Sequence, residues 1–260
     1  MKKILIVCLF FLLYLARPAM AADKTSQQYY EDFLKSFRQY QSLVEPFKTK
    51  KSQHQAFQSV TTQAELLGVS QELLKAEIKA ISDYTHFVKT YLAEATQILN
   101  YQENYLYVKL DDEVTFLKLS EQKASSLSSL AEANSLAKDL ETHYQRITQM
   151  AYQTKSIVEI ASAQKIFTNL GVEREKLEKY LSEQDQQGSQ FLAAKEKLSA
   201  LETETKEIKE NLSQAESLKR GFGSSGGKNL AEKIRTEIDE ALSKIKQVLT
   251  GYQNIVFSLK

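Results

Sequence analysis

Residues that cross-link or interrupt a chain are scarce in this sequence. Its 260 residues include one cysteine, two prolines, eight glycines and no tryptophan. The cysteine, Cys8, lies inside an apolar N-terminal segment and directly after Val7, which is not the position of a lipidation site. The rest of the chain can therefore form neither a disulfide nor a thiolate metal site. All-β proteins need frequent turn residues, which this chain lacks, and its apolar residues recur at intervals of three and four. The pattern predicts an all-α fold.

The chain also lacks an excess of charge of either sign. It has 34 Lys and Arg against 33 Asp and Glu, a formal net charge of +1. Removal of residues 1–22 would leave a formal charge of −2, because it takes Lys2, Lys3 and Arg17 and no acid. Binding to nucleic acid depends on clustered basic residues that displace counterions. With no long basic run, the composition gives no support for a nucleic-acid partner or for strong attraction to anionic lipids.

The first twenty-two residues have the pattern of a secretory signal peptide. Two lysines precede a short apolar segment, residues 4–16, and the tripeptide AMA at 19–21 matches a signal-peptidase site. A helix of that length spans about 20 Å, short of the ~30 Å hydrocarbon core of a bilayer. We therefore expect cleavage after Ala21 or Ala22 and an exported product, which is periplasmic, on the cell surface or secreted. Retention as an uncleaved N-terminal anchor is the alternative.

Apolar periodicity predicts several helices between residues 25 and 170. Thr25 or Ser26 can cap a first helix, which Pro46 should bend or end. A second stretch should stop at Gly68, with Ser70 as the cap of a long third helix. The first helix is expected to bury a largely aromatic face made of Tyr30, Phe33, Phe37, Tyr40 and Val44.

The next two segments are predicted from spacing and capping. Segment 104–120 fits a helix, although its YLYVKL portion could form a strand, and the spacing of its leucines favours the helix. Ser129-x-x-Glu132 is a capping box that should open another helix. Gly171 should end that helix in the left-handed conformation that glycine adopts readily.

The last third of the chain carries heptad seams. Apolar residues repeat at alternating intervals of three and four between Phe191 and Ala215, and again between Ile234 and Ile255. If the chain folds back near residue 224 or 225, every apolar layer of the first stretch meets one of the second. We therefore expect an antiparallel coiled-coil hairpin over residues 171–260, with a glycine-rich turn at 221–227. Its own seam is too small to offset the entropy of ordering it, so it should pack on helix 130–169 or on a second copy.

Residues 221–226 read GFGSSG and match G-x-G-x-x-G, a pattern of phosphate-binding loops. A dinucleotide-binding loop follows a strand, whereas the residues before this one continue a helical seam. A P-loop needs a hydroxyl residue after its lysine, and Asn229 follows Lys228. We interpret the loop as a turn, with Asn229-x-x-Glu232 capping the next helix. No nucleotide cofactor is expected.

No reactive constellation stands out. His54, His86 and His143 are far apart in sequence and belong to no H-E-x-x-H motif, so no metal site is expected. The run DDE at 111–113 lacks the ligand spacing of a calcium loop and should be a first helical turn or a solvated face. The many acids leave a glycosidase-type carboxylate pair open, although alternating Glu and Lys are typical of solvated faces. We expect no catalytic, cofactor-binding or metal-binding residue.

Aromatic residues are the remaining candidates for contact with a partner. Phe222, in the glycine-rich turn, should either fold back over the hairpin or touch a partner or membrane surface. Several tyrosines could instead form a surface on which a sugar or peptide stacks, and packing in the core is the alternative for them. These tyrosines are Tyr29, Tyr30, Tyr101, Tyr105 and Tyr107.

Two stretches carry a resemblance to a known group of proteins. The opening YYEDFLKSFRQY and the segment KLDDEVTFLKLSEQKASSLSSLAEANSLAKDLETHYQRI resemble uncharacterised exported all-helical proteins of reduced-genome, candidate-phylum bacteria. The resemblance covers most of the chain from the end of the signal peptide to about residue 170. It implies a bacterial, exported, helical protein and brings no function and no catalytic residue with it.

The sequence thus predicts three parts: a signal peptide at 1–22, an aromatic-rich helical bundle at 23–170 and the hairpin at 171–260. The expected function is a non-enzymatic scaffold of the cell envelope that binds other proteins or itself, with no small-molecule ligand indicated. One alternative is a membrane-surface-binding or toxin-like helical protein. Others are a holdase-type clamp for exported chains and an enzyme that acts on wall polymers.

Overall fold

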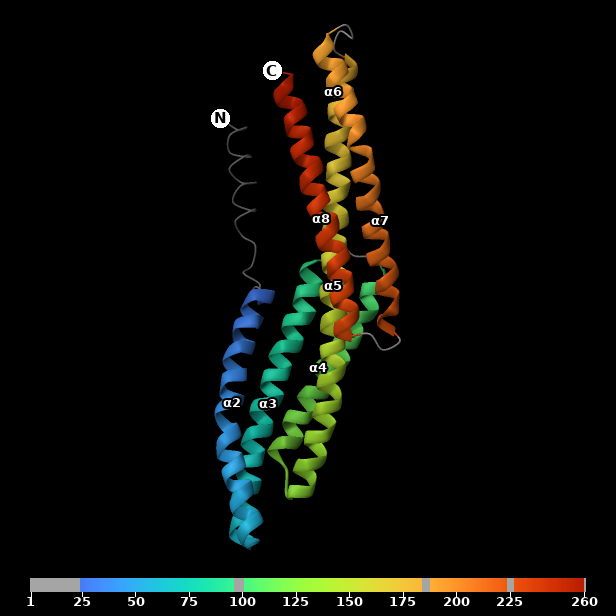
Figure 1. Ribbon diagram of the computed structural model, residues 1–260. Helices are drawn as coiled ribbons and strands as arrows, with labels where there is room; N and C mark the ends of the chain where they lie inside the picture. Colours follow the sequence, from blue (N-terminus) through green and yellow to red (C-terminus); the bar gives the residue numbers. More distant parts are fainter. Residues whose placement is uncertain (1–23, 96–100, 184–187, 224–226, 260) are drawn as a thin grey trace, which may run out of the picture.

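The computed structural model describes residues 24–95, 101–183, 188–223 and 227–259, and these are almost entirely helical. Figure 1 shows two groups of helices stacked end to end, with one long helix, α5 (Leu130–Glu183), running through both. The described residues contain no strand, so the predicted all-α fold is confirmed. The predicted signal peptide lies outside the described residues.

Helix α2 (Ser26–Phe57) begins at one of the two predicted caps. The Thr25 hydroxyl accepts the Gln28 N–H, and the Gln28 side chain accepts the Thr25 N–H at 2.9 Å. The sequence predicted that Pro46 would bend or end this helix. An end at Pro46 is wrong, because α2 continues through Pro46 to Phe57. An interior proline costs a helix roughly 3 kcal/mol. Since α2 packs along α3, tertiary contacts offset that local cost.

Helix α3 (Val60–Glu94) is one continuous helix where the sequence predicted two. Ser59 caps it by accepting the Thr62 N–H at 3.1 Å, and the helix passes Gly68 without a break. Ser70 is therefore not a cap, and its hydroxyl donates to the Leu66 carbonyl at 2.7 Å in the helix interior. The correction has a packing reason: α3 contacts α2, α4 and α5, and a break would interrupt all three interfaces.

The next two segments are helical, as predicted. Helix α4 (Tyr101–Ser125) confirms that segment 104–120 is helical. At the start of α5, the Ser129 hydroxyl accepts the Glu132 N–H at 3.2 Å. The Glu132 carboxylate accepts the Ser128 N–H at 2.8 Å, one residue before the donor that a capping box would supply.

Helix α5 does not end at Gly171, contrary to the prediction, and no described glycine has a positive φ. Its first half packs with α3 and α4 around a lower core, and its second half packs with the C-terminal helices around an upper core. An end at Gly171 would withdraw the last two leucines from the upper core, so burial keeps the helix intact. The side chains that α5 gives to the two cores are Ala133, Leu136, Leu140, Ile147, Met150 and Ile157 below, and Ile160, Ala163, Leu170, Leu177 and Leu181 above.

The last third forms a hairpin that packs on the second half of α5, one of the two placements predicted for it. The incoming seam is divided at Leu201, where a single helix was expected. Asn229 lies inside the outgoing helix and is not the cap that was predicted. The elements of the hairpin are α6 (Ser189–Ala200), α7 (Glu202–Lys219), the 3-10 turn η2 (Arg220–Gly223) and α8 (Gly227–Ser258).

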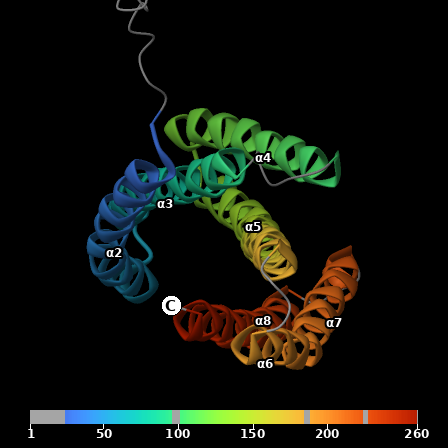
Figure 2. The ribbon, with the colours of Figure 1, turned by 90° about the horizontal axis from the view of Figure 1, so that it is seen from above.

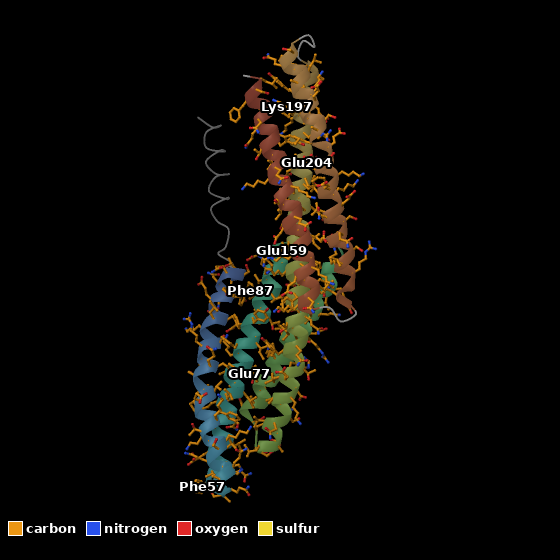
Figure 3. The ribbon with its side chains drawn as sticks, viewed as in Figure 1. Phe57, Glu77, Phe87, Glu159, Lys197 and Glu204 are labelled. Carbon is orange, nitrogen blue, oxygen red and sulfur yellow. The ribbon has the colours of Figure 1, made fainter. Side chains whose placement is uncertain are left out.

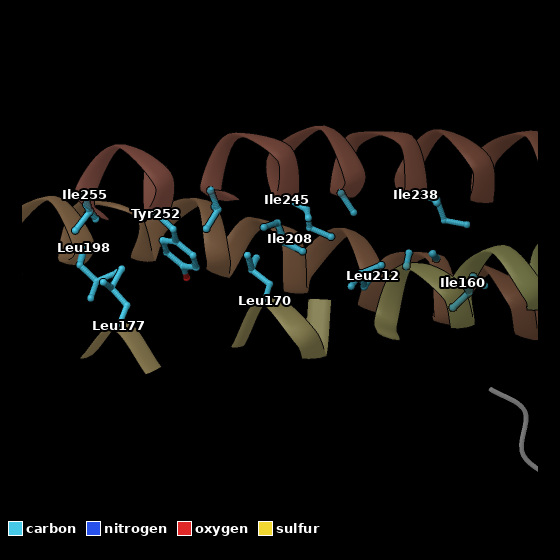
Figure 4. Close-up of a cluster of buried hydrophobic side chains, with 14 of the residues drawn as sticks. Ile160, Leu170, Leu177, Leu198, Ile208, Leu212, Ile238, Ile245, Tyr252 and Ile255 are labelled. Carbon is cyan, nitrogen blue, oxygen red and sulfur yellow. The ribbon is translucent and has the colours of Figure 1, made fainter. Parts of the chain in front are cut away.

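Polar contacts across the hairpin show its register. Asn211 Nδ2 donates to carboxylate oxygens of Glu237 and Glu240, each at 3.0 Å, and Lys244 Nζ pairs with Glu207 Oε2 at 2.7 Å. These contacts require α7 and α8 to run antiparallel, in the register that the heptad pattern predicted. Residues 224 and 225, where the fold-back was predicted, lie outside the described residues. Figure 4 shows apolar side chains of both arms of the hairpin, α6 with α7 and α8, meeting those of α5 in one cluster.

Replacement of Gly171 by alanine should raise the free energy of unfolding by about 0.5–1 kcal/mol, because glycine in a helix interior is disfavoured by that amount. A Cβ at this position would meet no atom within 4 Å. Urea unfolding followed by circular dichroism measures the change. Gly251→Ala is the matched control, since a Cβ there would lie 2.7 Å from Leu201 Cδ1 and should bring no gain. Equal stabilisation by both substitutions would contradict the close packing of α8 on Leu201.

Candidate functional site

The tyrosines proposed as a stacking surface lie in different surroundings. Tyr105 is 66% exposed, with Lys109 Nζ 4.4 Å from its ring centroid. Tyr107 packs against the lower core instead, and the side chain of Tyr101 lies outside the described residues. The other two tyrosines contact α3: the ring centroid of Tyr29 lies 5.3 Å from that of His86, and the centroid of Tyr30 lies 5.3 Å from that of Phe87.

Phe222 takes the first of its two predicted placements. Its ring is half-buried and packs against the upper core, so the turn folds back over the helices. The same residue lines a polar cavity of about 470 Å³ between the turn and helices α4 and α5. A partner or membrane contact through a projecting Phe222 ring therefore has no support in the geometry.

The polar cavity contains a buried ion-pair candidate, Glu113 with His143. His143 Nδ1 lies 2.5 Å from Glu113 Oε2, and its ring stacks on Phe116 at 3.4 Å between centroids. Glu113 lies in the middle of α4 and is buried, so the prediction of a first helical turn or a solvated face is wrong for this residue. Among the described residues, no group of three or more His, Cys, Asp or Glu is placed to hold a metal ion. The pair links α4 to α5.

A second concavity is more unusual, and we call it the acidic aromatic groove. It encloses about 420 Å³ between α2, α3 and α5. Figure 2 shows these three helices as an arc, with α4 on its outer side. The described residues that line the groove include five aromatic rings and two carboxyl groups, and no Lys, Arg, His, Asn or Gln. They are Phe33, Phe37, Tyr40, Glu77, Ala80, Ile81, Tyr84, Glu141 and Tyr144.

The aromatic rings of the groove come from helical positions that face one another. On α2, Phe33 and Phe37 have ring centroids 5.7 Å apart, and Phe33 lies 5.1 Å from Tyr84 on α3. Tyr144 of α5 completes the set. Two of these rings remain well exposed, Phe37 at 38% and Tyr144 at 44%. The face predicted for burial along α2 therefore packs on α3 only in part, and its remainder opens into the groove.

Glu77 has an electrostatic environment that does not suit a carboxylate. Burial raises the pKa of Glu77 to about 7, and the nearby charge of Glu141 adds to the shift. Among the described residues, Glu77 makes no hydrogen bond and no ion pair, whereas Glu141 accepts a hydrogen bond from Gln145 at 2.8 Å. Figure 3 places Glu77 midway along the lower group of helices. Sequence reasoning missed this residue, because an isolated Glu on a helix gives no signal of its own.

The phenols around Glu77 respond to the same surroundings. Burial raises the pKa of Tyr84 to about 12, with smaller contributions from Tyr144 and Tyr152. Burial also raises the pKa of Tyr40, and the charges of Glu77 and Glu141 add to it. These groups thus stay neutral phenols, and the groove presents aromatic faces and carboxyl oxygens. Both are attractive to a positive charge.

Ionisation of Glu77 should destabilise the fold. Its pKa is about 7 in the folded state, against 4.5 for an unperturbed Glu. The folded state therefore holds this proton more tightly than the unfolded state does. The resulting contribution to stability is complete below pH 4.5 and is lost as the pH rises through 7. The difference between the two pKa values corresponds to at most about 3 kcal/mol.

Urea unfolding at several pH values tests this expectation. Glu77→Gln should be more stable than the wild type at pH 8 and similar to it at pH 4.5, because glutamine stays neutral at both. Glu72→Gln, at an exposed position of the same helix, is the matched control and should unfold like the wild type. An identical pH dependence of the wild type and Glu77→Gln would show that Glu77 does not titrate in this range.

Comparison with known proteins adds no assignment to these sites. No family model matches the chain, no curated protein matches it, and no solved structure matches it. The acidic aromatic groove, which five aromatic rings and two carboxyl groups line, is therefore the candidate site.

Proposed function

We propose that this chain is an exported, non-enzymatic helical protein of the cell envelope that acts as a scaffold by binding another protein. The N-terminal pattern of residues 1–22 supports export, and the resemblance of residues 23–170 to exported bacterial helical proteins supports the same compartment. The end-to-end arrangement of the two helical groups along α5 supports a scaffold, because it gives a small chain a long surface.

The observation that carries the proposal is the incomplete packing of α2. This helix packs on α3, and no other described helix shares a comparable interface with it. Among the residues of α2, only Ser36 is fully buried, although the helix carries a row of aromatic side chains. Exposed apolar surface of this kind, bordered by polar residues, is typical of a protein–protein interaction site. A partner laid along the acidic aromatic groove would cover it.

Site-specific crosslinking tests the proposal. A photoreactive phenylalanine analogue at Tyr144 should give one crosslinked product of defined mass in the native envelope fraction, and mass spectrometry would identify the partner. The same analogue at Lys209, which is exposed on α7, is the control and should not give that product. Recovery of only uncrosslinked monomer, or the same products from both positions, would contradict a partner in the groove.

The membrane-surface alternative keeps one specific observation in its favour. At the turn between α2 and α3, Phe57 is 75% exposed and Val60 is 84% exposed, and Figure 3 shows Phe57 at the far end of the molecule. Of the lysines nearby, Lys48 pairs with Glu45 and Lys50 with Glu65, whereas Lys51 Nζ lies 5.9 Å from the ring centroid of Phe47. No helix among the described residues is both long enough and apolar enough to cross a membrane.

Liposome flotation measures the strength of this contact. Full burial of two apolar side chains contributes about 2 kcal/mol each, too little for stable attachment without help from charge. We therefore expect the protein without its signal peptide to stay unbound on neutral and anionic vesicles alike. If it does float, loss of flotation in Phe57→Ser would assign the contact to this tip and would favour the membrane-surface function over the scaffold.

A further inference from the structure

The acidic aromatic groove has two chemically different ends. At one end, Phe33 of α2 meets Tyr84 of α3, with 5.1 Å between ring centroids. At the other end, Tyr40 of α2 lies close enough to Glu77 and Glu141 for both charges to raise the pKa of its phenol. Phe33 and Tyr40 are two turns apart on one helix, so the ends are separated by about 10 Å. Between them the floor is apolar, formed by Ala80 and Ile81.

The acidic end favours a positive charge that the described part of the chain does not supply. Glu77 is partly buried and makes no ion pair or hydrogen bond with any described residue. It shares the acidic end of the groove with Tyr40 from α2 and with Glu141 and Tyr144 from α5. None of these neighbours is basic. A partly buried carboxyl group with no basic neighbour in the groove lowers the stability of the protein above its pKa, and proteins tend to retain such costs at functional sites. A cation placed here would stabilise the ionised form of Glu77.

The aromatic end restricts the kind of cation. A lysine side chain has a flexible stem of four methylene groups that packs on apolar surface, while its ammonium group reaches polar partners. This length and polarity match a groove with an apolar floor and one acidic end. A guanidinium group is a planar fork that needs carboxylate oxygens in its own plane, and a quaternary ammonium ion has no stem to occupy the aromatic end.

We propose that the acidic aromatic groove binds a lysine side chain of the partner protein, with the ammonium group between Glu77 and Glu141 and the stem along Phe33, Phe37 and Ile81. This inference rests on the proposed function and names the chemistry of the partner at that site. In this proposal the ionised Glu77 carboxylate lowers the stability of the free protein and attracts the ammonium group in the complex.

Titration of the purified protein without its signal peptide, residues 23–260, with synthetic peptides tests the inference without knowledge of the partner. The probe is a short alanine–glutamine peptide, acetylated and amidated at its ends, with one central lysine. The matched peptide has norleucine in place of lysine, which keeps the stem and removes the charge. Choline, which carries the charge without the stem, is the third ligand. NMR shifts of the tyrosine ring protons report binding, with Kd values measured at pH 8.

The lysine peptide should bind at least five-fold more tightly than either the norleucine peptide or choline. Glu77→Gln should remove most of that difference, while Glu72→Gln at its exposed position on α3 should leave it unchanged. The preference for lysine should also fall when the pH is lowered from 8 to 5.5, because Glu77 gains a proton in this range. Burial raises the pKa of Tyr40 and of Tyr84, which also line the groove, so both remain neutral phenols throughout.

Three results would overturn the inference. Equal binding of the lysine and norleucine peptides would show that the groove reads only apolar surface. Tighter binding of choline than of the lysine peptide would assign the groove to a small quaternary ammonium ion. No shift with any ligand would show that the groove binds no cation. The scaffold function is tested separately, since a specific crosslink from Tyr144 would still support it after any of these outcomes.

Discussion

Burial of the apolar stripe of α5 is the interaction on which the rest of the structure depends. The chain has a single cysteine, within the N-terminal segment, and no described strand pairs its two halves. What joins the lower and upper cores is one helix that contributes side chains to both, from Ala133 to Ile157 below and from Ile160 to Leu181 above. Because the stripe passes from one core to the next without a break, the two helical groups are held end to end.

The same dependence on burial explains why residues that usually interrupt helices do not do so here. Pro46, Gly68 and Gly171 all lie inside helices that continue past them. Each costs a helix between about 1 and 3 kcal/mol. If a helix ended at one of these residues, a longer stretch would lose its packing. Part of α2 or α3 would separate from the other, or the end of α5 would separate from the hairpin. Local propensity is therefore a weak guide to helix ends in an elongated bundle of this kind.

The acidic aromatic groove is where the packing is least satisfied. The lower core is closed by α3, α4 and the first half of α5, and α2 adds its aromatic face from one side only. That arrangement leaves Phe37 and Tyr144 exposed and encloses Glu77 without a basic neighbour. Both features lower the stability of the free protein, and the apolar, positively charged partner that we propose would relieve both.

Much of the architecture follows from the sequence alone, because it depends on local periodicity and capping. Helical spacing with few glycines and prolines predicted the all-α fold. The Thr25 cap was predictable because it depends on a hydrogen bond between a side chain and the nearby backbone. The heptads predicted the register that the contact between Asn211 and Glu237 shows. The tertiary structure decided the features that join residues distant in sequence. Glu77 and Glu141 belong to different helices, as do Glu113 and His143, and no periodicity indicates which of many acids will meet. Phe222 was placed over the upper core by the path of the turn, which the spacing of residues does not specify. The physical reason is range: hydrogen bonds and apolar repeats act within a few turns of one helix, whereas a groove exists only after three helices have packed.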